Sequence, residues 1–355
     1  MSEKKQLFLS FGNLEHTFNP STTLILQKKI YLMSNYLDET VNLYTEAALT
    51  PDVGLCCTTT PVWVLPELEI PTKMLEMNYG CGSTVDPRDL INDPTVLYVG
   101  VGGGMELLQF SYFSRKKGAV IGLDVVPEMI EASRENFVEA EKQNPWFKSE
   151  FVDLRLGDAL NLPIDNESID VAAQNCLFNI FTKADLRKAL EEMYRVLKPY
   201  GRLVLSDPVS ESKMPEALKN DDRLRALCLS GAMTLKEYID TITSVGFGTV
   251  EVRAKRPYRI LDPKHYDTAE NIYIESVEVC AIKDPMPEDG PCVFTGKTAI
   301  YYGSEEYFDD NNGHVLMSNQ PLAVCDKTSG DLKGLGRDDI FVSESTYFYD
   351  GGGCC

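Results

Sequence analysis

Residues 94–283 alternate short runs rich in β-branched residues with longer amphipathic stretches, and this alternation constrains the fold more than any other feature of the sequence. The pattern is typical of βαβ units, in which parallel strands are joined by helices. The strands that it predicts cover residues 95–101, 119–124, 151–156, 169–175 and 202–206. We therefore predict an α/β fold with a doubly wound parallel sheet.

The predicted helices cover residues 105–115, 127–142, 183–198, 216–229 and 234–245. Two further β-rich runs, residues 248–260 and 272–283, follow the last helix. We expect these runs to pair as an antiparallel hairpin at one edge of the sheet, because parallel sheets often carry such an edge. With this hairpin the sheet has seven strands.

The two ends of the chain differ from this central part. Residues 1–93 show helical pieces but no regular pattern, and we expect them to form an N-terminal cap or lid. A linker rich in proline, residues 285–291, follows the last strand. The expected organisation is a cap (residues 1–93), a core domain (94–284) and a small β-rich C-terminal extension (285–355).

The charge balance limits the partners of the chain. It contains 34 Lys and Arg against 54 Asp and Glu, which gives a formal net charge of −20. This charge repels phosphate backbones and anionic lipids, so we expect no nucleic acid as partner. No run approaches the 18 apolar residues of a membrane-spanning helix, and residues 1–11 do not resemble a signal peptide. We expect a cytoplasmic protein that does not bind membranes.

A glycine-rich run, VGVGGG, stands where the first predicted strand turns into the first predicted helix. Glycine lets a ligand approach the backbone closely, and the N–H groups at the start of the helix face the polar end of that ligand. We therefore assign three glycines to a cofactor site: Gly100, Gly102 and Gly104. A tight turn without a ligand is the alternative interpretation.

Two acidic residues follow the next two strands. Asp124 ends the second predicted strand, where a carboxylate can accept hydrogen bonds from both hydroxyls of a ribose. Asp158 and Ala159 follow the third strand, where an acid can meet an adenine. The order and spacing predict a nucleotide-type cofactor, with helix capping as the alternative role for both carboxylates.

The glycine run has the pattern G-x-G-x-G, and residues 197–207 read LKPYGRLVLSD. This combination resembles the S-adenosylmethionine methyltransferases of the seven-stranded, Rossmann-like class. The resemblance implies S-adenosylmethionine as the cofactor. Tyr98 departs from the pattern, because this family commonly has an acid before the first glycine, and the contacts to the methionine part of the cofactor therefore stay open.

The chain has ten cysteines but only three histidines, and no two cysteines have the C-x-x-C spacing of a zinc ribbon or thioredoxin site. A site for a soft ligand must therefore combine thiols that are distant in the sequence. Cys176 follows the fourth predicted strand, Cys228 lies in a helix after the fifth, and Cys81 precedes the first. All three can reach one rim of the sheet. For each of them, a small buried apolar side chain is the alternative.

Four segments that contain cysteine resemble those of the arsenite methyltransferases: LCCTTT, NYGCG, QNCLFN and LCLSGAMTLKEY, at residues 55–60, 78–82, 174–179 and 227–238. The resemblance implies that Cys81, Cys176 and Cys228 bind trivalent arsenic as the substrate. It also implies that Tyr79 packs near the cofactor, and we expect Asn175 at the same place.

The resemblance also covers the adjacent residues Cys56 and Cys57, and it leaves open which of them is the functional thiol. It implies that this thiol and Cys81 form a transient disulfide. Methyl transfer oxidises arsenic, so a dithiol that closes to a disulfide would return the arsenic to the trivalent state. Glutathione or thioredoxin is the reductant that we expect to reset the pair.

The chemistry of thiols agrees with this function. Thiolates prefer soft centres over the hard ions that are abundant in cells. Arsenic held by three thiolates keeps a lone pair, which can attack the S-methyl carbon of a sulfonium without a general base. We expect an enzyme that methylates arsenite and methylarsenite in arsenic detoxification or biotransformation.

Two other functions remain open at this point. One is methylation of a small organic molecule such as a quinone, because LKPYGRLVLSD is shared across the wider class of methyltransferases. The other is a non-catalytic protein that binds metalloids through its thiols. A separate hypothesis concerns Cys354 and Cys355, which follow three glycines at the end of the sequence and would deliver arsenite to the site. The alternative is that this tail has no role.

Overall fold

A computed structural model describes residues 36–52, 55 and 63–347. Its central element is an eight-stranded sheet with the order β3-β2-β1-β4-β5-β7-β6-β8. The strands are β1 (Val96–Val99), β2 (Val120–Asp124), β3 (Val152–Leu156), β4 (Ile169–Asn175), β5 (Leu197–Ser210), β6 (Thr249–Leu261), β7 (Ile272–Ile282) and β8 (Cys292–Phe294). The first five strands are parallel, whereas β7 pairs antiparallel with both β5 and β6. The predicted doubly wound sheet and its antiparallel hairpin are confirmed.

The central strands β1 and β2 are buried on both faces. In β1, Val96 and Tyr98 belong to one core cluster, whereas Leu97 and Val99 belong to the other. This separation follows from the period of two along a strand, which sends successive side chains to opposite faces. A run of apolar residues without alternation is therefore the correct pattern for a sheet that is covered on both sides.

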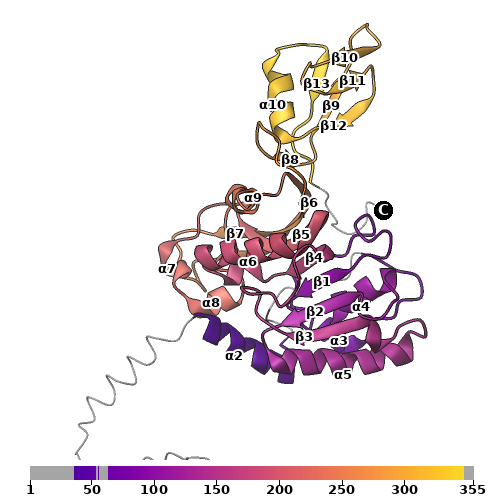
Figure 1. The fold of residues 1–355 in the computed structure, drawn as a ribbon. Helices are drawn as coiled ribbons and strands as arrows, with labels where there is room; N and C mark the ends of the chain where they lie inside the picture. The colour runs from indigo at the N-terminus through magenta and orange to yellow at the C-terminus, as the bar shows by residue number, and fades with distance from the viewer. Residues whose placement is uncertain (1–35, 53–54, 56–62, 348–355) are drawn as a thin grey trace, which may run out of the picture.

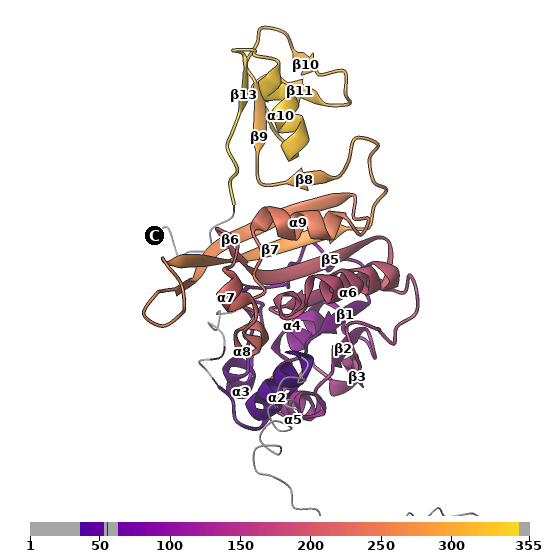
Figure 2. The same cartoon turned by 90° about the vertical axis from the view of Figure 1, so that its left-hand side faces the viewer.

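Helices cover both faces, as Figures 1 and 2 show. On one face, α4 (Met105–Phe113) and α5 (Pro127–Gln143) supply Leu107, Leu108 and Phe137 to the core. On the other face, α6 (Lys183–Val196) and α9 (Leu235–Thr243) supply Leu190, Met193 and Ile242. Short 3₁₀ turns at η1 (Ser149–Phe151) and η2 (Phe178–Ile180) lead into β3 and α6.

The helix predicted over residues 216–229 is instead two short helices, α7 (Glu216–Lys219) and α8 (Asp222–Ala226). Asp221 separates them, and its side chain accepts a hydrogen bond of 2.9 Å from the backbone N–H of Leu224. An aspartate at this position begins a new helix rather than continuing the old one. The break positions Cys228 just beyond α8.

The C-terminal extension adds an eighth strand to the expected seven. The segment after the linker forms β8, which pairs parallel with β6. The extension then folds around its own small core of Ala299, Tyr301, Leu316, Val324 and Leu332. Its elements are β9 (Thr298–Tyr301), β10 (Tyr307–Asp309), β11 (Val315–Met317), β12 (Pro321–Ala323), α10 (Asp326–Gly334) and β13 (Ile340–Val342), and Figure 1 shows them beyond the β8 edge of the sheet.

The described part of the N-terminal region contributes α2 (Tyr36–Leu49) and α3 (Thr72–Glu76). α2 packs against α5 and α8, which places it beside the carboxyl ends of the parallel strands. Among the helices of the described residues, none is both long and apolar enough to cross a membrane.

Candidate active site

The glycine loop connects β1 to α4 in backbone conformations that favour glycine. Gly100, Gly102 and Gly104 have φ angles of +84°, +51° and +87°, all in the left-handed region. A Cβ atom on Gly102 would lie 3.3 Å from the backbone oxygen of Met77, so the loop also packs closely against the segment before β1. The loop leaves its backbone accessible to a ligand because side chains are absent.

Asp124 lies beside this loop at the end of β2. Its Oδ2 accepts a hydrogen bond of 2.9 Å from the N–H of Val101, and its Oδ1 accepts one of 2.9 Å from the N–H of Val126. Burial raises the pKa of Asp124 to about 6, although these backbone hydrogen bonds favour the charged form. The carboxylate is thus fixed in orientation, and each oxygen keeps a lone pair for a further donor.

A small pocket brings several predicted site residues together. Its lining includes Tyr79, Gly100, Gly102, Asp124, Asn175 and Cys176. From α2, Thr40 and Tyr44 also line it, and the Tyr79 hydroxyl donates a hydrogen bond of 3.0 Å to the backbone oxygen of Ala47. The pocket measures only about 90 Å³, whereas ligand pockets commonly measure about 300–1,000 Å³. Helix α2 therefore covers part of this pocket, and the backbone and side-chain groups of the pocket suit a nucleoside, which contains a ribose.

Glu106 was not predicted from the sequence, and it lies in contact with Tyr98. The Tyr98 hydroxyl donates a hydrogen bond to Glu106 Oε2, and Glu106 Oε1 accepts hydrogen bonds from the N–H and hydroxyl of Thr84. Asn175 Nδ2 donates to Glu106 Oε2 at 3.2 Å. Helix α4 thus supplies a buried carboxylate next to the position where an acid was missing. The sequence does contain a signal for Glu106, because it is an acid in the first helical turn after the glycine loop.

Cys176 and Cys228 lie next to each other. The Cys228 thiol donates a hydrogen bond of 2.6 Å to the backbone oxygen of Cys176. Both residues are buried, and both have left-handed backbone conformations, with φ angles of +60° and +59°. Left-handed conformations at residues other than glycine are uncommon and cluster at functional sites.

Cys81 reaches the same region from the segment before β1. Its N–H donates a hydrogen bond of 2.9 Å to Asn175 Oδ1, and its Sγ lies 3.5 Å from the hydroxyl of Ser206. A Cβ on Gly80 would lie 2.4 Å from Asn175 Nδ2, and one on Gly82 would lie 2.4 Å from Ser206 Oγ. The two glycines of NYGCG therefore let Cys81 lie close to Asn175 at the end of β4 and to Ser206 in β5.

The three thiols are neighbours but do not form a preassembled metal cage. Both Cys81 and Cys176 interact electrostatically with the buried hydroxyls of Tyr98 and Tyr238. Within the described residues, no group of three or more His, Cys, Asp or Glu side chains is spaced to hold a metal ion. Simultaneous ligation of one atom by all three sulfurs therefore requires side-chain rearrangement, beginning with release of the Cys228 thiol from the Cys176 carbonyl.

Other predicted residues lie apart from the pocket or outside the described residues. Asp158 accepts a hydrogen bond of 2.8 Å from the N–H of Leu160, and Ala159 is buried in the core on the α6 side. Neither is among the residues that line the pocket beside Asp124. The predictions for Cys56, Cys57, Cys354 and Cys355 fall outside the described residues.

Asp207 was also missed by the sequence reasoning. It is fully buried near the end of β5, where it accepts hydrogen bonds from the Tyr238 hydroxyl at 2.6 Å and from Gln174 Nε2. Burial raises the pKa of Asp207 to about 7. Gln174 in turn accepts a hydrogen bond of 2.8 Å from the N–H of Leu177. This network fixes the turn that carries Cys176.

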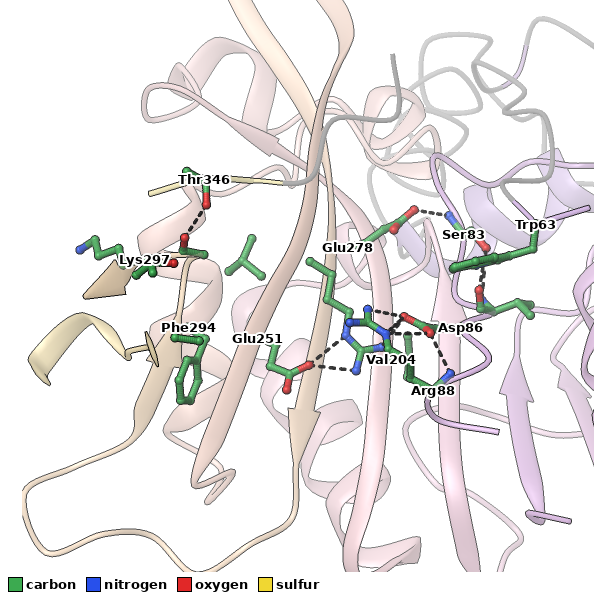
Figure 3. A pocket seen from close by; sticks show the side chains of 16 residues that line it. Trp63, Ser83, Asp86, Arg88, Val204, Glu251, Glu278, Phe294, Lys297 and Thr346 are labelled. Atoms are coloured by element: carbon green, nitrogen blue, oxygen red, sulfur yellow. Dashed lines mark hydrogen bonds and ion pairs between the residues drawn. The ribbon is translucent and has the colours of Figure 1, made fainter. Parts of the chain in front are cut away.

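A larger cleft of about 750 Å³ lies between the sheet and the C-terminal extension (Figure 3). Its charged side chains are in ion pairs: Arg253, for example, contacts Asp86, Asp89 and Glu251. Glu278 likewise accepts a hydrogen bond of 2.7 Å from the N–H of Ser83. Because the cleft contains neither the glycine loop nor Asp124, we assign the cofactor to the smaller pocket despite its size.

Comparison with known proteins indicates the class of the domain. A family described as "Methyltransferase domain" matches residues 92–262. Such a domain implies S-adenosylmethionine as its methyl donor. The crystal structure of CrArsM, an arsenic(III) S-adenosylmethionine methyltransferase from Chlamydomonas reinhardtii, has a TM-score of 0.57 and 21% identity, covering 82% of this chain and 100% of that one. This likeness supports the fold.

Two curated proteins are similar to this chain in sequence. The arsenite methyltransferase of Halobacterium salinarum is 31% identical over 180 residues, covering 51% of this chain and 44% of that protein. The arsenite methyltransferase of Mus musculus is 28% identical over 273 residues, covering 76% of this chain and 63% of that protein. The chain thus spans less than two thirds of the length of either relative. The chain is thus similar to curated arsenite methyltransferases over a part of their length, and its residues 92–262 match a methyltransferase domain.

Proposed function

We propose that this protein transfers a methyl group from S-adenosylmethionine to trivalent arsenic bound by cysteine thiolates. The observation that carries the proposal is the contact of the Cys228 thiol with the Cys176 backbone oxygen beside the pocket that contains Asp124. Two cysteines that are 52 residues apart in the sequence are thus in contact, and one of them, Cys176, lines the pocket. A small organic acceptor gives no reason for this convergence.

The residues around the pocket fit the parts of the cofactor. Asp124 would accept hydrogen bonds from the ribose, and the backbone of Gly100 and Gly102 would lie against the chain that carries the sulfonium. Glu106 would fix Asn175 near the amino-acid end, because it binds the Asn175 side chain directly. S-adenosylmethionine supplies an electrophilic methyl group when it is bound.

The thiols would select and position the arsenic. Cys176, Cys228 and Cys81 have exposed fractions of 3%, 0% and 1%, so a bound arsenical would be shielded from water. Soft thiolates favour arsenic over hard ions, and positioning replaces the need for a general base. Arsenite would use three thiolates, whereas methylarsenite would need only Cys176 and Cys228.

The further parts of the proposal concern the cell. Methylation would serve arsenic detoxification or biotransformation in the cytoplasm, with glutathione or thioredoxin as the reductant. Cys81 and one of Cys56 and Cys57 would form the disulfide that this reductant opens.

Incubation of the purified protein with arsenite, glutathione and S-adenosylmethionine tests the function, with separation of arsenic species by chromatography and mass detection. We expect methylated arsenicals with the native protein and none with Cys176→Ser. Cys280→Ser is the matched control, because Cys280 is buried in β7 and belongs to none of the pocket linings described above. Cofactor binding without any methylated arsenic, together with methylation of a quinone, would favour the small-molecule alternative.

A further inference from the structure

Two cysteines outside the active site bring their thiols into contact. Cys292 begins β8, and Cys325 lies 33 residues later as the N-cap of α10. The two side chains interact with each other, and α10 packs against β8. Cys325 is buried, Cys292 is half-buried, and both are free cysteines. Neither residue contributes to the pocket that contains Asp124.

A chain of polar contacts leads from this pair to a carboxylate. Cys325 Sγ lies 3.2 Å from the Thr328 hydroxyl, which lies 3.3 Å from His314 Nε2. His314 Nδ1 lies 2.7 Å from Asp310 Oδ2. Asp310 therefore holds the proton on Nδ1 and leaves Nε2 as an acceptor. The thiol can pass its proton through the Thr328 hydroxyl to His314.

One cation, Lys327, lies near the same pair. The Lys327 ammonium interacts electrostatically with both Cys292 and Cys325, and it is held in place by the backbone oxygen of Gly290 at 2.8 Å and by Asp289. Cys325 also stands at the N-terminus of a nine-residue helix, whose dipole favours a thiolate. Burial, the neighbouring Cys325 thiol and the Asp289 carboxylate raise the pKa of Cys292, and the Lys327 ammonium opposes them.

We propose that Cys292 and Cys325 form a second dithiol site that binds one trivalent arsenical away from the active site. The step needs no oxidant: arsenite and two thiols give a dithioarsenite and two water molecules, as two As–O bonds are replaced by two As–S bonds. Thiols in mutual contact suit ligation of one atom by both sulfurs. The choice of arsenic rests on the proposed function.

The bound arsenical would link two parts of the fold. β8 pairs with β6 in the central sheet, whereas α10 packs in the extension against β13. An atom bonded to Cys292 and Cys325 would therefore cross-link the sheet edge to the extension. Binding at this site would stabilise the extension without contacting the methyl-transfer pocket.

The test is a titration of the reduced, full-length protein with phenylarsine oxide, which takes two thiols, followed by native mass spectrometry. We expect Cys292→Val and Cys325→Ser each to bind one equivalent fewer than the native protein. Cys280→Ser, a buried cysteine of β7, should bind as much as the native protein. Methylation at saturating arsenite should be unchanged in all three variants, which also verifies their folding.

Equal stoichiometry in the native protein and in Cys292→Val would overturn the proposal. So would a Cys292–Cys325 disulfide that persists under glutathione and excludes the arsenical. If the variants bind one equivalent of phenylarsine oxide fewer while neither they nor the native protein methylate arsenic, the dithiol site is supported and the proposed function is wrong. His314→Gln should slow the binding at this site several-fold and leave the final stoichiometry unchanged, which a purely structural role for His314 would not produce.

Discussion

The Cys228 thiol donates a hydrogen bond of 2.6 Å to the backbone oxygen of Cys176, and both residues occupy left-handed backbone conformations. A left-handed backbone conformation at a residue other than glycine raises the free energy of the folded state by about 1–3 kcal/mol. The surrounding structure must therefore hold both cysteines in this conformation. The Asp207 network does so for Cys176, because it fixes the turn after β4. The strained backbone is thus located where the Cys228 thiol contacts the Cys176 carbonyl.

Replacement of either thiol should separate binding of the cofactor from methyl transfer. Cys176→Ser and Cys228→Ser should each reduce arsenite methylation by at least 100-fold, because a hydroxyl is a poor ligand for arsenic. The affinity for S-adenosylmethionine, measured by calorimetry, should stay within about twofold of the native value, because neither substitution alters Asp124 or the glycine loop. Near-native turnover in either variant would exclude a thiolate site at these residues.

Cys81→Ser should discriminate between the two arsenical substrates. Methylarsenite already carries one methyl group, so Cys176 and Cys228 suffice to fill its remaining positions. We therefore expect the variant to lose methylation of arsenite and to retain methylation of methylarsenite. Equal losses on both substrates, measured as initial rates, would show that Cys81 acts on the fold or on the cofactor instead.

Asp124 should control the affinity for the cofactor. Asp124→Ala removes the acceptors of two ribose hydroxyls, and each hydrogen bond is worth about 0.5–1.5 kcal/mol, so the Kd should rise by about 5- to 150-fold. Asp124→Asn keeps one acceptor oxygen and should have an intermediate effect. An unchanged Kd in Asp124→Ala would place the ribose elsewhere.

The affinity for S-adenosylmethionine should also fall at mildly acidic pH. Burial raises the pKa of Asp124 to about 6, so protonation of the free protein below this pH removes a charged acceptor. Protonation of Asp124 has the opposite effect on the stability of the fold. Because its pKa is higher in the folded protein than in the unfolded chain, the free energy of unfolding is lowered above pH 6, and this decrease becomes smaller as the pH falls towards 4. Calorimetry between pH 5 and 8 should show the loss in the native protein. A similar loss in Asp124→Asn would assign the titration to another group, such as Asp207.

Glu106 should support the cofactor site through Asn175. Glu106→Ala would leave the Tyr98 hydroxyl, the Thr84 N–H and the Asn175 amide without their buried acceptor. We expect at least a tenfold rise in the Kd for S-adenosylmethionine, because buried donors without a partner cost about 1–3 kcal/mol each. Glu106→Gln should retain part of the affinity. An unchanged Kd in a folded Glu106→Ala variant would show that the network is only structural.

Local patterns in the sequence predicted the parallel part of the fold well. β4 begins and ends where the run of apolar residues indicated, so the prediction placed Cys176 just after a strand. The break between α7 and α8 was missed because Asp221 competes with the helical periodicity through a single capping hydrogen bond. The pairing of β8 with β6 was not predicted, because a three-residue strand has too short a pattern.

The chemistry of the site was predicted in part for similar reasons. Cysteine and glycine motifs identified the loop and the thiols, because their residue types are rare and their spacing is specific. Glu106 and Asp207 were missed because an acid has no distinctive pattern when it lies inside a helix or strand. Only the packing of distant segments reveals that these carboxylates are buried and hydrogen-bonded.

The pairing of β8 with β6 has a consequence for truncated forms of the protein. A chain that ends at residue 284 would lose β8 and expose the backbone N–H and C=O groups of β6 that now pair with it. Unpaired strand edges of this kind recruit other strands and promote aggregation. The β8 segment therefore protects the first residues of β6, Thr249–Glu251, from self-association, whereas the rest of this strand already carries charged residues and Pro257.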